Sequence, residues 1–398
     1  MRVFLVTSKL NFETAGGAVY DLHLKARGLA EREHNVTVVT AFSYANKISI
    51  PLPYRVREEF VVSRGLIGIQ RGVFRILKKY GKEADVFYVD GHMFLYGAGL
   101  YRFRSGSKPV LAFFNVKLNS WVPKKTVTAL GWILEHAKQN IRKLIERIFG
   151  VPLANRIDSF AFNAPTVEAL YHRFGIANKK PCVILPDYVD AAAIMQDVGW
   201  TPKTLADHHR LKKPVTFFSG GRMIPEKGFD LLLRAFARIP NKEQYRLIIT
   251  GGGPVEKDLH ALSHELGLDG LVSFPGWVKK SEVSSFMRQA HVFILPRWIL
   301  EYASAVVSEA MAHGIPCIVT AGGGVEWLTK GGALTFPEND VTALAGRMQE
   351  LAENDALRIR FAKANLKKAE DLSYQKLTLL LERSLSEIVK NRKMNFFR

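Results

Sequence analysis

Residues 215–239 read VTFFSGGRMIPEKGFDLLLRAFARI and place a strand, a glycine-rich turn and a helix in immediate succession. The apolar run 215–219 has the length of a buried strand, and 229–239 carries apolar residues at helical spacing. Glycines let a backbone approach a ligand closely, and a helix start offers N–H groups to an anion. Arg222 and Lys227 add two cations there. Taken alone, these residues fit a phosphate site or a solvated turn equally well.

The same alternation of strand and helix runs through most of the chain. We expect strands at 3–7, 36–40, 86–90, 110–114, 157–162, 215–219, 246–250, 272–274, 291–295 and 317–320. We expect helices at 19–33, 127–149, 229–239, 255–266, 281–289, 305–313, 341–354, 357–370 and 374–390. Such alternation predicts parallel, doubly wound α/β sheets with both faces covered.

The length of 398 residues suits two domains. A polar, proline-flanked stretch at 199–214 separates two runs of alternating elements. We therefore expect two facing Rossmann-like domains with a cleft between them, at 1–195 and 196–372. A C-terminal helix at about 373–398 is expected to pack back on the first domain.

The charge is unevenly distributed. Positions 1–190 hold 28 Lys and Arg against 15 Asp and Glu, whereas the whole chain has 56 against 37. This excess implies an anionic partner. The sequence contains no helix-turn-helix, RNP or zinc signature, so we expect no nucleic acid. It also has no run of about 20 apolar residues. Cys182 and Cys317 lie in apolar runs without a metal pattern, which suits a reducing compartment, by default the cytoplasm.

A second candidate site lies at 301–316, EYASAVVSEAMAHGIP. If a helix begins near its fourth residue, Glu301 lies in the preceding loop and Glu309 projects from the second turn. Two carboxylates at a helix start can accept hydrogen bonds from sugar hydroxyls. Phosphates would meet the first backbone amides of that helix: Ser304, Ala305 and Val306. The alternative is a pair of surface glutamates, although an unpaired carboxylate is costly in the apolar stretch around Glu309.

Several short motifs follow one another in order. They are Gly16-Gly17, Pro186-Asp-Tyr-Val-Asp190, Gly221-Arg-x4-Lys-Gly228, Gly251-Gly-Gly-Pro254, Pro275-Gly-Trp-Val278, Glu301-x7-Glu309 and Gly323-Gly-Val-Glu326. This ordered set resembles the retaining glycosyltransferases of family 4, the glycosyl transferases group 1, which have the GT-B fold. The resemblance spans nearly the whole chain and is strongest from Gly220 to Pro337.

The resemblance implies a role for each motif. Arg222 and Lys227, beside Gly221, correspond to a diphosphate clamp, and Glu309 to the ribose ligand. Glu301 corresponds to the carboxylate that faces the donor sugar. Two further segments have implied roles: the backbone of Trp277 and Val278 reads the base, and Gly16 and Gly17 close over the leaving group or acceptor.

The chain departs from the family at several positions. Asn115 stands where the family often places a sugar-contacting His, and His92, after the fourth strand, is a nearby substitute. Ser304 replaces a Gly, and Arg297 replaces a common Ser. The family's Pro-Asn-Gly-Val-Asp reads Pro186-Asp-Tyr-Val-Asp190 here.

The resemblance implies a hexosyltransferase that moves a sugar, with retention, from a nucleoside-diphosphate sugar to a lipid-linked or glycan acceptor in cell-envelope assembly. No Asp-x-Asp lies in a suitable loop, so we expect no metal or other cofactor. A guanine base presents hydrogen-bond donors that a carboxylate would accept, but Lys279 and Lys280 follow the base-reading segment. We therefore favour UDP over GDP as the nucleotide. Glu282 leaves GDP open as the alternative.

Basic residues alternate with large apolar ones at 71–80 and 133–148, which predicts peripheral binding to the anionic inner face of the membrane. Ordinary surface helices are the alternative. Other functions stay open: a GT-B 2-epimerase, a transferase with a small soluble acceptor, a non-catalytic nucleotide-binding regulator, or a nucleic-acid-binding protein.

Overall fold

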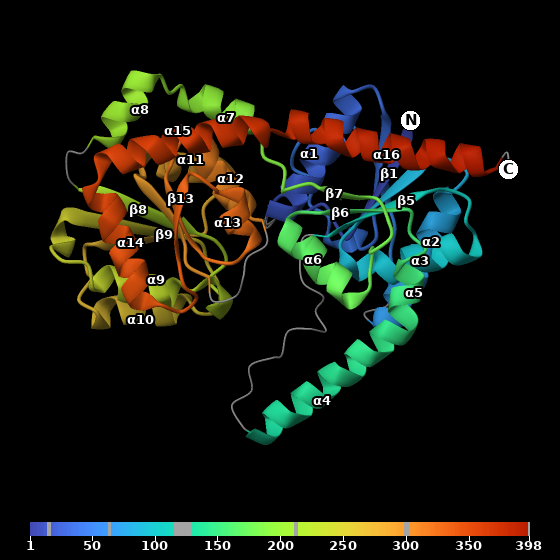
Figure 1. Cartoon of the computed structure of the whole chain (residues 1–398), viewed down its shortest axis with the longest axis horizontal. Coiled ribbons are helices and arrows are strands. Elements are labelled where there is room, and N and C mark those ends of the chain that lie inside the picture. Colours follow the sequence, from blue (N-terminus) through green and yellow to red (C-terminus); the bar gives the residue numbers. More distant parts are fainter. Residues whose placement is uncertain (14–16, 63–64, 115–128, 211–213, 298–302, 397–398) are drawn as a thin grey trace. The chain divides into compact units, whose positions relative to one another are not determined.

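The computed structural model describes residues 1–13, 17–62, 65–114, 129–210, 214–297 and 303–396 (Figure 1). The chain forms two compact units, one of Met1–Tyr188 with Tyr374–Arg398 and one of Val189–Ser373. The sequence suggested a boundary after residue 195, whereas the chain leaves unit 1 after Tyr188. Val189 and Ser373 form a parallel bridge, so the outgoing and returning segments of the chain lie side by side.

Unit 1 is built on a parallel sheet with the strand order β3-β2-β1-β4-β5-β6-β7. The strands are β1 Arg2–Thr7, β2 Asn35–Thr40, β3 Arg55–Glu58, β4 Val86–Asp90, β5 Val110–Phe114, β6 Ser159–Phe162 and β7 Cys182–Ile184. Sequence reasoning missed the two edge strands. The sequence of β3 is the polar RVRE, and β7 has only three residues, so neither shows the long apolar run of a central strand.

Unit 1 also contains helices. They are α1 Gly17–Glu31, α2 Leu66–Tyr80, α3 Leu95–Arg104, α4 Ala129–Ile145, α5 Val151–Ala154, α6 Pro165–Phe174 and α16 Tyr374–Phe396. A π-helical turn, Glu146–Gly150, joins α4 to α5. The last helix, α16, places Leu377, Leu381, Leu385 and Ile388 in the core of unit 1, because residues three or four apart share one helix face. The C-terminal helix thus belongs to the first unit.

Unit 2 has a parallel sheet with the strand order β10-β9-β8-β11-β12-β13. The strands are β8 Val215–Gly220, β9 Tyr245–Thr250, β10 Val272–Gly276, β11 Val292–Leu295, β12 Cys317–Thr320 and β13 Ala333–Phe336. The helices are α7 Ala191–Val198, α8 Pro202–His209, α9 Phe229–Ala237, α10 Glu256–Glu265, α11 Lys280–Gln289, α12 Ala305–Ala312, α13 Gly324–Leu328, α14 Val341–Glu353 and α15 Asp355–Asp371. The predicted class, two parallel doubly wound α/β sheets, is confirmed.

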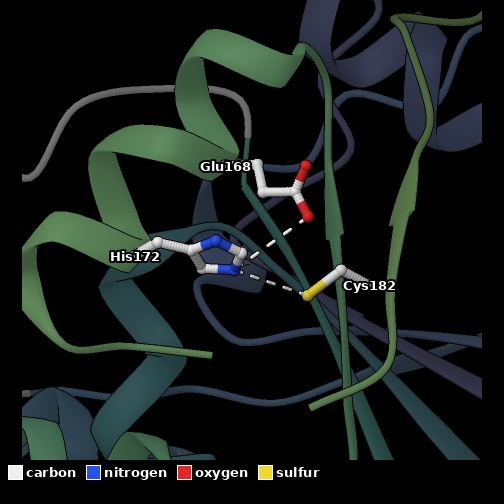
Figure 2. A group of neighbouring side chains, drawn as sticks. All are labelled: Glu168, His172 and Cys182. Atoms are coloured by element: carbon white, nitrogen blue, oxygen red, sulfur yellow. Dashed lines mark hydrogen bonds and ion pairs between the residues drawn. The ribbon is translucent and has the colours of Figure 1, made fainter. Parts of the chain in front are cut away.

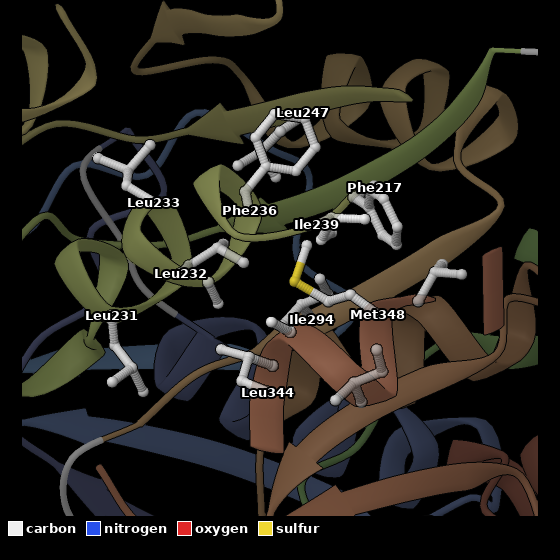
Figure 3. Close-up of a cluster of buried hydrophobic side chains, with 14 of the residues drawn as sticks. Phe217, Leu231, Leu232, Leu233, Phe236, Ile239, Leu247, Ile294, Leu344 and Met348 are labelled. Carbon is white, nitrogen blue, oxygen red and sulfur yellow. The ribbon is translucent and has the colours of Figure 1, made fainter. Parts of the chain in front are cut away.

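Two hydrophobic cores lie on the two faces of the second sheet. Phe217 joins a cluster that includes Leu232 and Phe236 of α9 (Figure 3). The next residue, Phe218, joins a cluster that includes Val307 and Met311 of α12. Neighbouring strand residues point to opposite faces, so α9 and α12 cover opposite faces of the sheet.

Within the described part of the chain, no helix is both long enough and apolar enough to cross a membrane.

The packing of α16 against α1 leaves no room for a side chain at Gly28. A β-carbon there would overlap Thr378 Oγ1. We expect Gly28→Ala to lower the free energy of unfolding by about 1–3 kcal/mol through overpacking. Gly346→Ala in α14 is the matched control, because no atom lies within 4 Å of its added β-carbon. That control should stabilise by about 0.4–1 kcal/mol. Urea unfolding measures both, and Thr378→Ala should rescue Gly28→Ala if the contact is responsible.

Candidate functional site

The strand order of unit 2 reverses between β8 and β11, which are hydrogen-bonded neighbours. The helices that follow these two strands cover opposite faces of the sheet. In open parallel sheets, ligands bind in the crevice that such a reversal leaves beyond the carboxyl ends of the strands. The segments after β8 and β11 are therefore where a binding site is expected, and both glycine- and carboxylate-bearing motifs lie there.

The loop after β8 turns on two glycines in conformations that other residues rarely adopt. Gly221 has φ 146°, and Gly228, which precedes α9, has φ 66°. Between them Met223 is fully buried, while Arg222 is exposed beside it. A β-carbon at Gly221 would lie 3.9 Å from Lys227 Nζ, so the ammonium group lies directly over this glycine. The loop thus brings Gly221, Arg222 and Lys227 together, and their role as a diphosphate clamp stays a prediction.

Two arginine side chains affect the protonation of Lys227. The pKa of Lys227 is lowered to about 7, first by burial and then by the positive charges of Arg297 and Arg222. In the sequence, Arg297 was noted only as a departure from the family. In the structure, its positive charge lowers the pKa of Lys227 more than that of Arg222 does. Its position two residues beyond β11, at the strand reversal, is the signal that could have identified it. A bound anion would relieve the repulsion among these groups.

The loops after β8 and β9 are in direct backbone contact. The amide of Gly221 donates to Thr250 O at 3.0 Å, and the amide of Met223 donates to Gly252 O at 2.9 Å. A β-carbon at Gly251 would overlap Gly221 O, and one at Gly253 would overlap Met223 O. Glycine is therefore required at both positions by close packing of backbone on backbone.

The loop after β10 adds an aromatic side chain to the same edge. The amide of Gly251 donates to Gly276 O at 2.8 Å, and a β-carbon at Gly252 would be 4.0 Å from Trp277 Cβ. The Trp277 side chain is 54% exposed, and Val278 follows it. The predicted base-reading segment therefore lies beside the glycine loop, within the same unit.

The helix α12 starts at Ala305, with Ser304 as an extended cap residue. The first turn leads to Val306 and Val307, and the amide of Val307 donates to Ser304 O at 3.0 Å. Glu309 is only 8% exposed, in a helix that is otherwise almost wholly buried. The second carboxylate of the motif, Glu301, lies outside the described residues.

The predicted sites in unit 1 have different outcomes. Gly16 and Asn115 lie outside the described residues, and Gly17 is the first residue of α1. His92 lies after β4, where the strand order of the first sheet reverses. Both of its ring nitrogens have protein partners, Glu146 Oε1 at 3.2 Å from Nε2 and Tyr171 OH at 3.3 Å from Nδ1. A sugar contact at His92 would have to replace one of these hydrogen bonds.

A buried charge network in unit 1 was not anticipated. Lys25 and Asp21 form a fully buried ion pair one helical turn apart, and Asp21 also accepts the amide of Tyr188 at 2.7 Å. Burial raises the pKa of Asp90 to about 6 and that of Asp187 to about 7. The spacing of Asp21 and Lys25 on a predicted helix was the available signal, but it does not distinguish a buried pair from an exposed one.

Comparison with known proteins shows what this arrangement resembles. Residues 202–368 match the family described as "Glycosyl transferases group 1". This part of the chain is a group 1 glycosyltransferase domain. The resemblance to the glycosyl transferases group 1 is therefore confirmed for residues 202–368, and this group 1 domain carries Arg222, Lys227 and Arg297.

Two curated relatives match the chain over part of its length. The putative colanic acid biosynthesis glycosyltransferase WcaL of Salmonella typhimurium is 30% identical over 185 residues, which cover 44% of this chain and 46% of WcaL. The lipopolysaccharide core biosynthesis glycosyltransferase LpsE of Rhizobium meliloti is 30% identical over 186 residues, 42% of this chain and 53% of LpsE. The chain thus spans about half the length of the curated relatives it matches.

The likeness in fold to solved structures extends over nearly the whole chain. The solved structure of Anabaena Alr3699/HepE in complex with UDP has a TM-score of 0.72, with 97% of this chain and 100% of HepE covered. At 16% sequence identity this likeness speaks for the fold alone. The expected GT-B fold is confirmed.

Because Lys227 has a pKa of about 7, anion binding should be coupled to protonation. Above pH 7 the side chain is mostly neutral, and a bound phosphate group would raise its pKa. We expect the protein to take up close to one proton when it binds UDP or inorganic pyrophosphate at pH 8. The affinity of the protein for these anions should fall as the pH rises above about 7. Calorimetry in buffers of different ionisation enthalpy measures the uptake. Lys227→Met should abolish it; undiminished uptake in that variant would exclude Lys227 as the coupled group.

Proposed function

We propose that the chain is a retaining hexosyltransferase that takes a sugar from a nucleoside-diphosphate sugar and transfers it to a lipid-linked or glycan acceptor of the cell envelope. The observation that carries this proposal is the cation cluster of Arg222, Lys227 and Arg297 at the strand reversal of a group 1 domain. WcaL and LpsE, named for colanic acid and lipopolysaccharide core synthesis, support an envelope acceptor.

The chemistry requires stabilisation of a leaving diphosphate. Transfer breaks the bond between the anomeric carbon and the phosphate oxygen, and negative charge develops on that oxygen. Fixed cations aimed at the developing charge lower the barrier. We propose that Arg222 and Lys227 take this role without a divalent metal, with the first amides of α12 beside them. The leaving phosphate then accepts the acceptor's proton on the same face of the sugar, which retains the anomeric configuration.

We propose UDP as the donor nucleotide. In this chain, the carboxylate nearest in sequence to the base-reading segment, Glu282, accepts the amide of Lys279 at 2.8 Å and so caps α11. That hydrogen bond engages the group that a guanine base would use. Glu309 remains the proposed ribose ligand, because it is a buried carboxylate on the helix that starts at the site.

We further propose that the acceptor is met at an anionic membrane surface, which α4 contacts. Figure 1 shows α4 extending away from the sheet of unit 1. The helix and the π-helical turn after it carry large apolar side chains that are each more than half exposed: Ile133, Leu134, Ile141, Leu144, Ile145, Ile148 and Phe149. The basic side chains Lys138, Arg142 and Arg147 are exposed among them. Such a helix suits the interface of an anionic bilayer.

A groove at the C-terminal end of α4 could hold the phosphate group of a lipid when α4 contacts the membrane. It has a volume of about 530 Å³ and lies between the C-terminal part of α4 and α6. Its lining combines basic and apolar side chains, among them Lys143, Arg147, Arg173, Leu170 and Phe174. Cations above an apolar floor match an amphiphile with a phosphate head.

The other predicted membrane segment, 71–80, is corrected by the structure. Ile76 and Leu77 face the core of unit 1 and are buried. Only the basic side chains of this part of α2 are exposed, and Lys79 pairs with Glu59 at 2.5 Å. The periodicity that suggested a membrane face is the amphipathic pattern of an ordinary surface helix.

Removal of a clamp cation should slow transfer. We expect Arg222→Ala and Lys227→Ala each to lower kcat/KM by roughly 100-fold or more, since each stabilises charge in the transition state. Transfer from UDP-sugars is measured without added Mg²⁺ or Mn²⁺. Arg234→Ala on α9, an exposed cation of the same unit, is the matched control. Normal turnover in both clamp variants, with the fold intact, would refute the assignment.

Membrane binding should depend on α4. The full chain should float with anionic liposomes at low salt and less at high salt, since the attraction is screened over about 8 Å at physiological ionic strength. Replacement of Leu134, Ile141 and Ile145 by Ser should abolish flotation without change in UDP affinity. Leu379→Ser with Leu380→Ser, at exposed apolar positions of α16, is the control. Failure of the unmodified chain to float would favour a soluble acceptor.

A further inference from the structure

A group of three possible metal ligands lies in unit 1, at the edge of the first sheet (Figure 2). Glu168 and His172 are one helical turn apart on α6, so their side chains leave the same face of that helix. Cys182 is the first residue of the edge strand β7. One oxygen, one nitrogen and one sulfur from these residues all lie within 4.8 Å of one another.

The distances distinguish a metal site from a catalytic triad. His172 Nε2 lies 3.8 Å from Cys182 Sγ and 4.0 Å from Glu168 Oε1. In a nucleophile–base–acid relay, the two partners face different nitrogens of the imidazole. Here thiol and carboxylate face the same nitrogen, so this arrangement cannot relay a proton between them. Three donor atoms that converge on one point are instead what a cation requires.

The donor set indicates which cation. Thiolate and imidazole ligands suit Zn²⁺, whereas Mg²⁺ and Ca²⁺ prefer oxygen ligands alone. With bonds of about 2.3 Å to sulfur and about 2.0–2.2 Å to nitrogen and oxygen, ligands of a tetrahedral zinc ion lie about 3.4–3.6 Å apart. The distances between the three donor atoms here exceed these values by tenths of an ångström to about 1 Å. Small rotations of the side chains would bring the donor atoms to zinc-binding distances. Glu168 and His172 are 27% and 36% exposed, so an ion can reach them.

We propose that Glu168, His172 and Cys182 form a three-ligand Zn²⁺ site that ties α6 to β7 and leaves a fourth position for water. Metal binding forms the sulfur–zinc bond and releases the thiol proton to solvent. The thiol holds that proton in the metal-free protein, because burial and the nearby Glu168 raise the pKa of Cys182 to about 12. The ion also competes with the contact of Sγ with Lys180 O at 3.3 Å.

The position of the site suggests what it does. The strand β7 pairs with β6 through only three residue pairs, Phe160 with Cys182, Ala161 with Val183 and Phe162 with Ile184. Soon after it the chain leaves unit 1, beyond Tyr188. A metal bridge to α6 would hold this short edge strand in place. The sequence spacing Glu-x3-His-x9-Cys matches no common zinc pattern, which is why sequence reasoning found none.

Cobalt is the probe, because it replaces zinc and its bond to a thiolate absorbs in the near ultraviolet. Titration of the full chain with Co²⁺ should give this thiolate-to-cobalt band, saturating at one equivalent, and Zn²⁺ should displace it. Cys182→Ser should remove the band, and His172→Ala should weaken binding at least tenfold. Cys317→Ser is the matched control, because the other cysteine is wholly buried in unit 2 and should not contribute.

A second measurement guards against loss of folding in the variants. Zn²⁺ should raise the Tm of the unmodified chain and of Cys317→Ser, with no rise for a folded Cys182→Ser, since ligand binding stabilises only a state that holds the site. A cobalt spectrum without a thiolate band, or the same band in Cys182→Ser, would overturn the proposal. Neither readout involves sugar transfer, so the result is independent of the proposed function.

Discussion

The reversal of strand order between β8 and β11 is the constraint on which the site of unit 2 depends. All strands of the sheet are parallel, so their carboxyl ends share one edge, and the reversal sends α9 and α12 to opposite faces. The connecting segments diverge there and leave a crevice. This crevice lies beside the glycine loop, Arg297 and the start of α12. A single feature of topology therefore brings together residues that are about 80 positions apart in the chain.

Each unit places one lysine in a distinct electrostatic environment. In unit 1, Lys25 is paired with Asp21, and its ammonium group lies 3.6 Å from the centre of the Phe113 ring. Its charge is satisfied by the protein itself. In unit 2, Lys227 is partly exposed, and desolvation together with the positive charges of Arg297 and Arg222 lowers its pKa to about 7. The first arrangement stabilises the fold, whereas the second fits the proposed phosphate site, because a nearby anion would raise the pKa of Lys227.

In unit 1, α4 and residues 71–80 of α2 differ in how far their apolar side chains are exposed. Basic and apolar residues alternate in α4 and in residues 71–80 of α2, but residues 71–80 bury Ile76 and Leu77, whereas α4 leaves Ile141 and Ile145 exposed. A large exposed apolar surface usually marks a site of contact with a partner. Residues 71–80 need no such partner, because their large apolar side chains are buried or half-buried within unit 1. For α4 the mixture of exposed apolar and basic groups matches a lipid surface, in agreement with the proposed lipid-linked acceptor.

The sequence by itself determined the alternation of elements, the glycine loop of residues 220–228 and the carboxylate at Glu309, because each is written in local spacing. It did not reveal the edge strands β3, β7 and β13: β3 is polar, and β7 and β13 are only three and four residues long. Only the tertiary structure decided that Arg297 joins Arg222 and Lys227, and that Cys182 meets His172. Strand order and register are set by packing between distant segments, and local periodicity carries no record of which segments become neighbours.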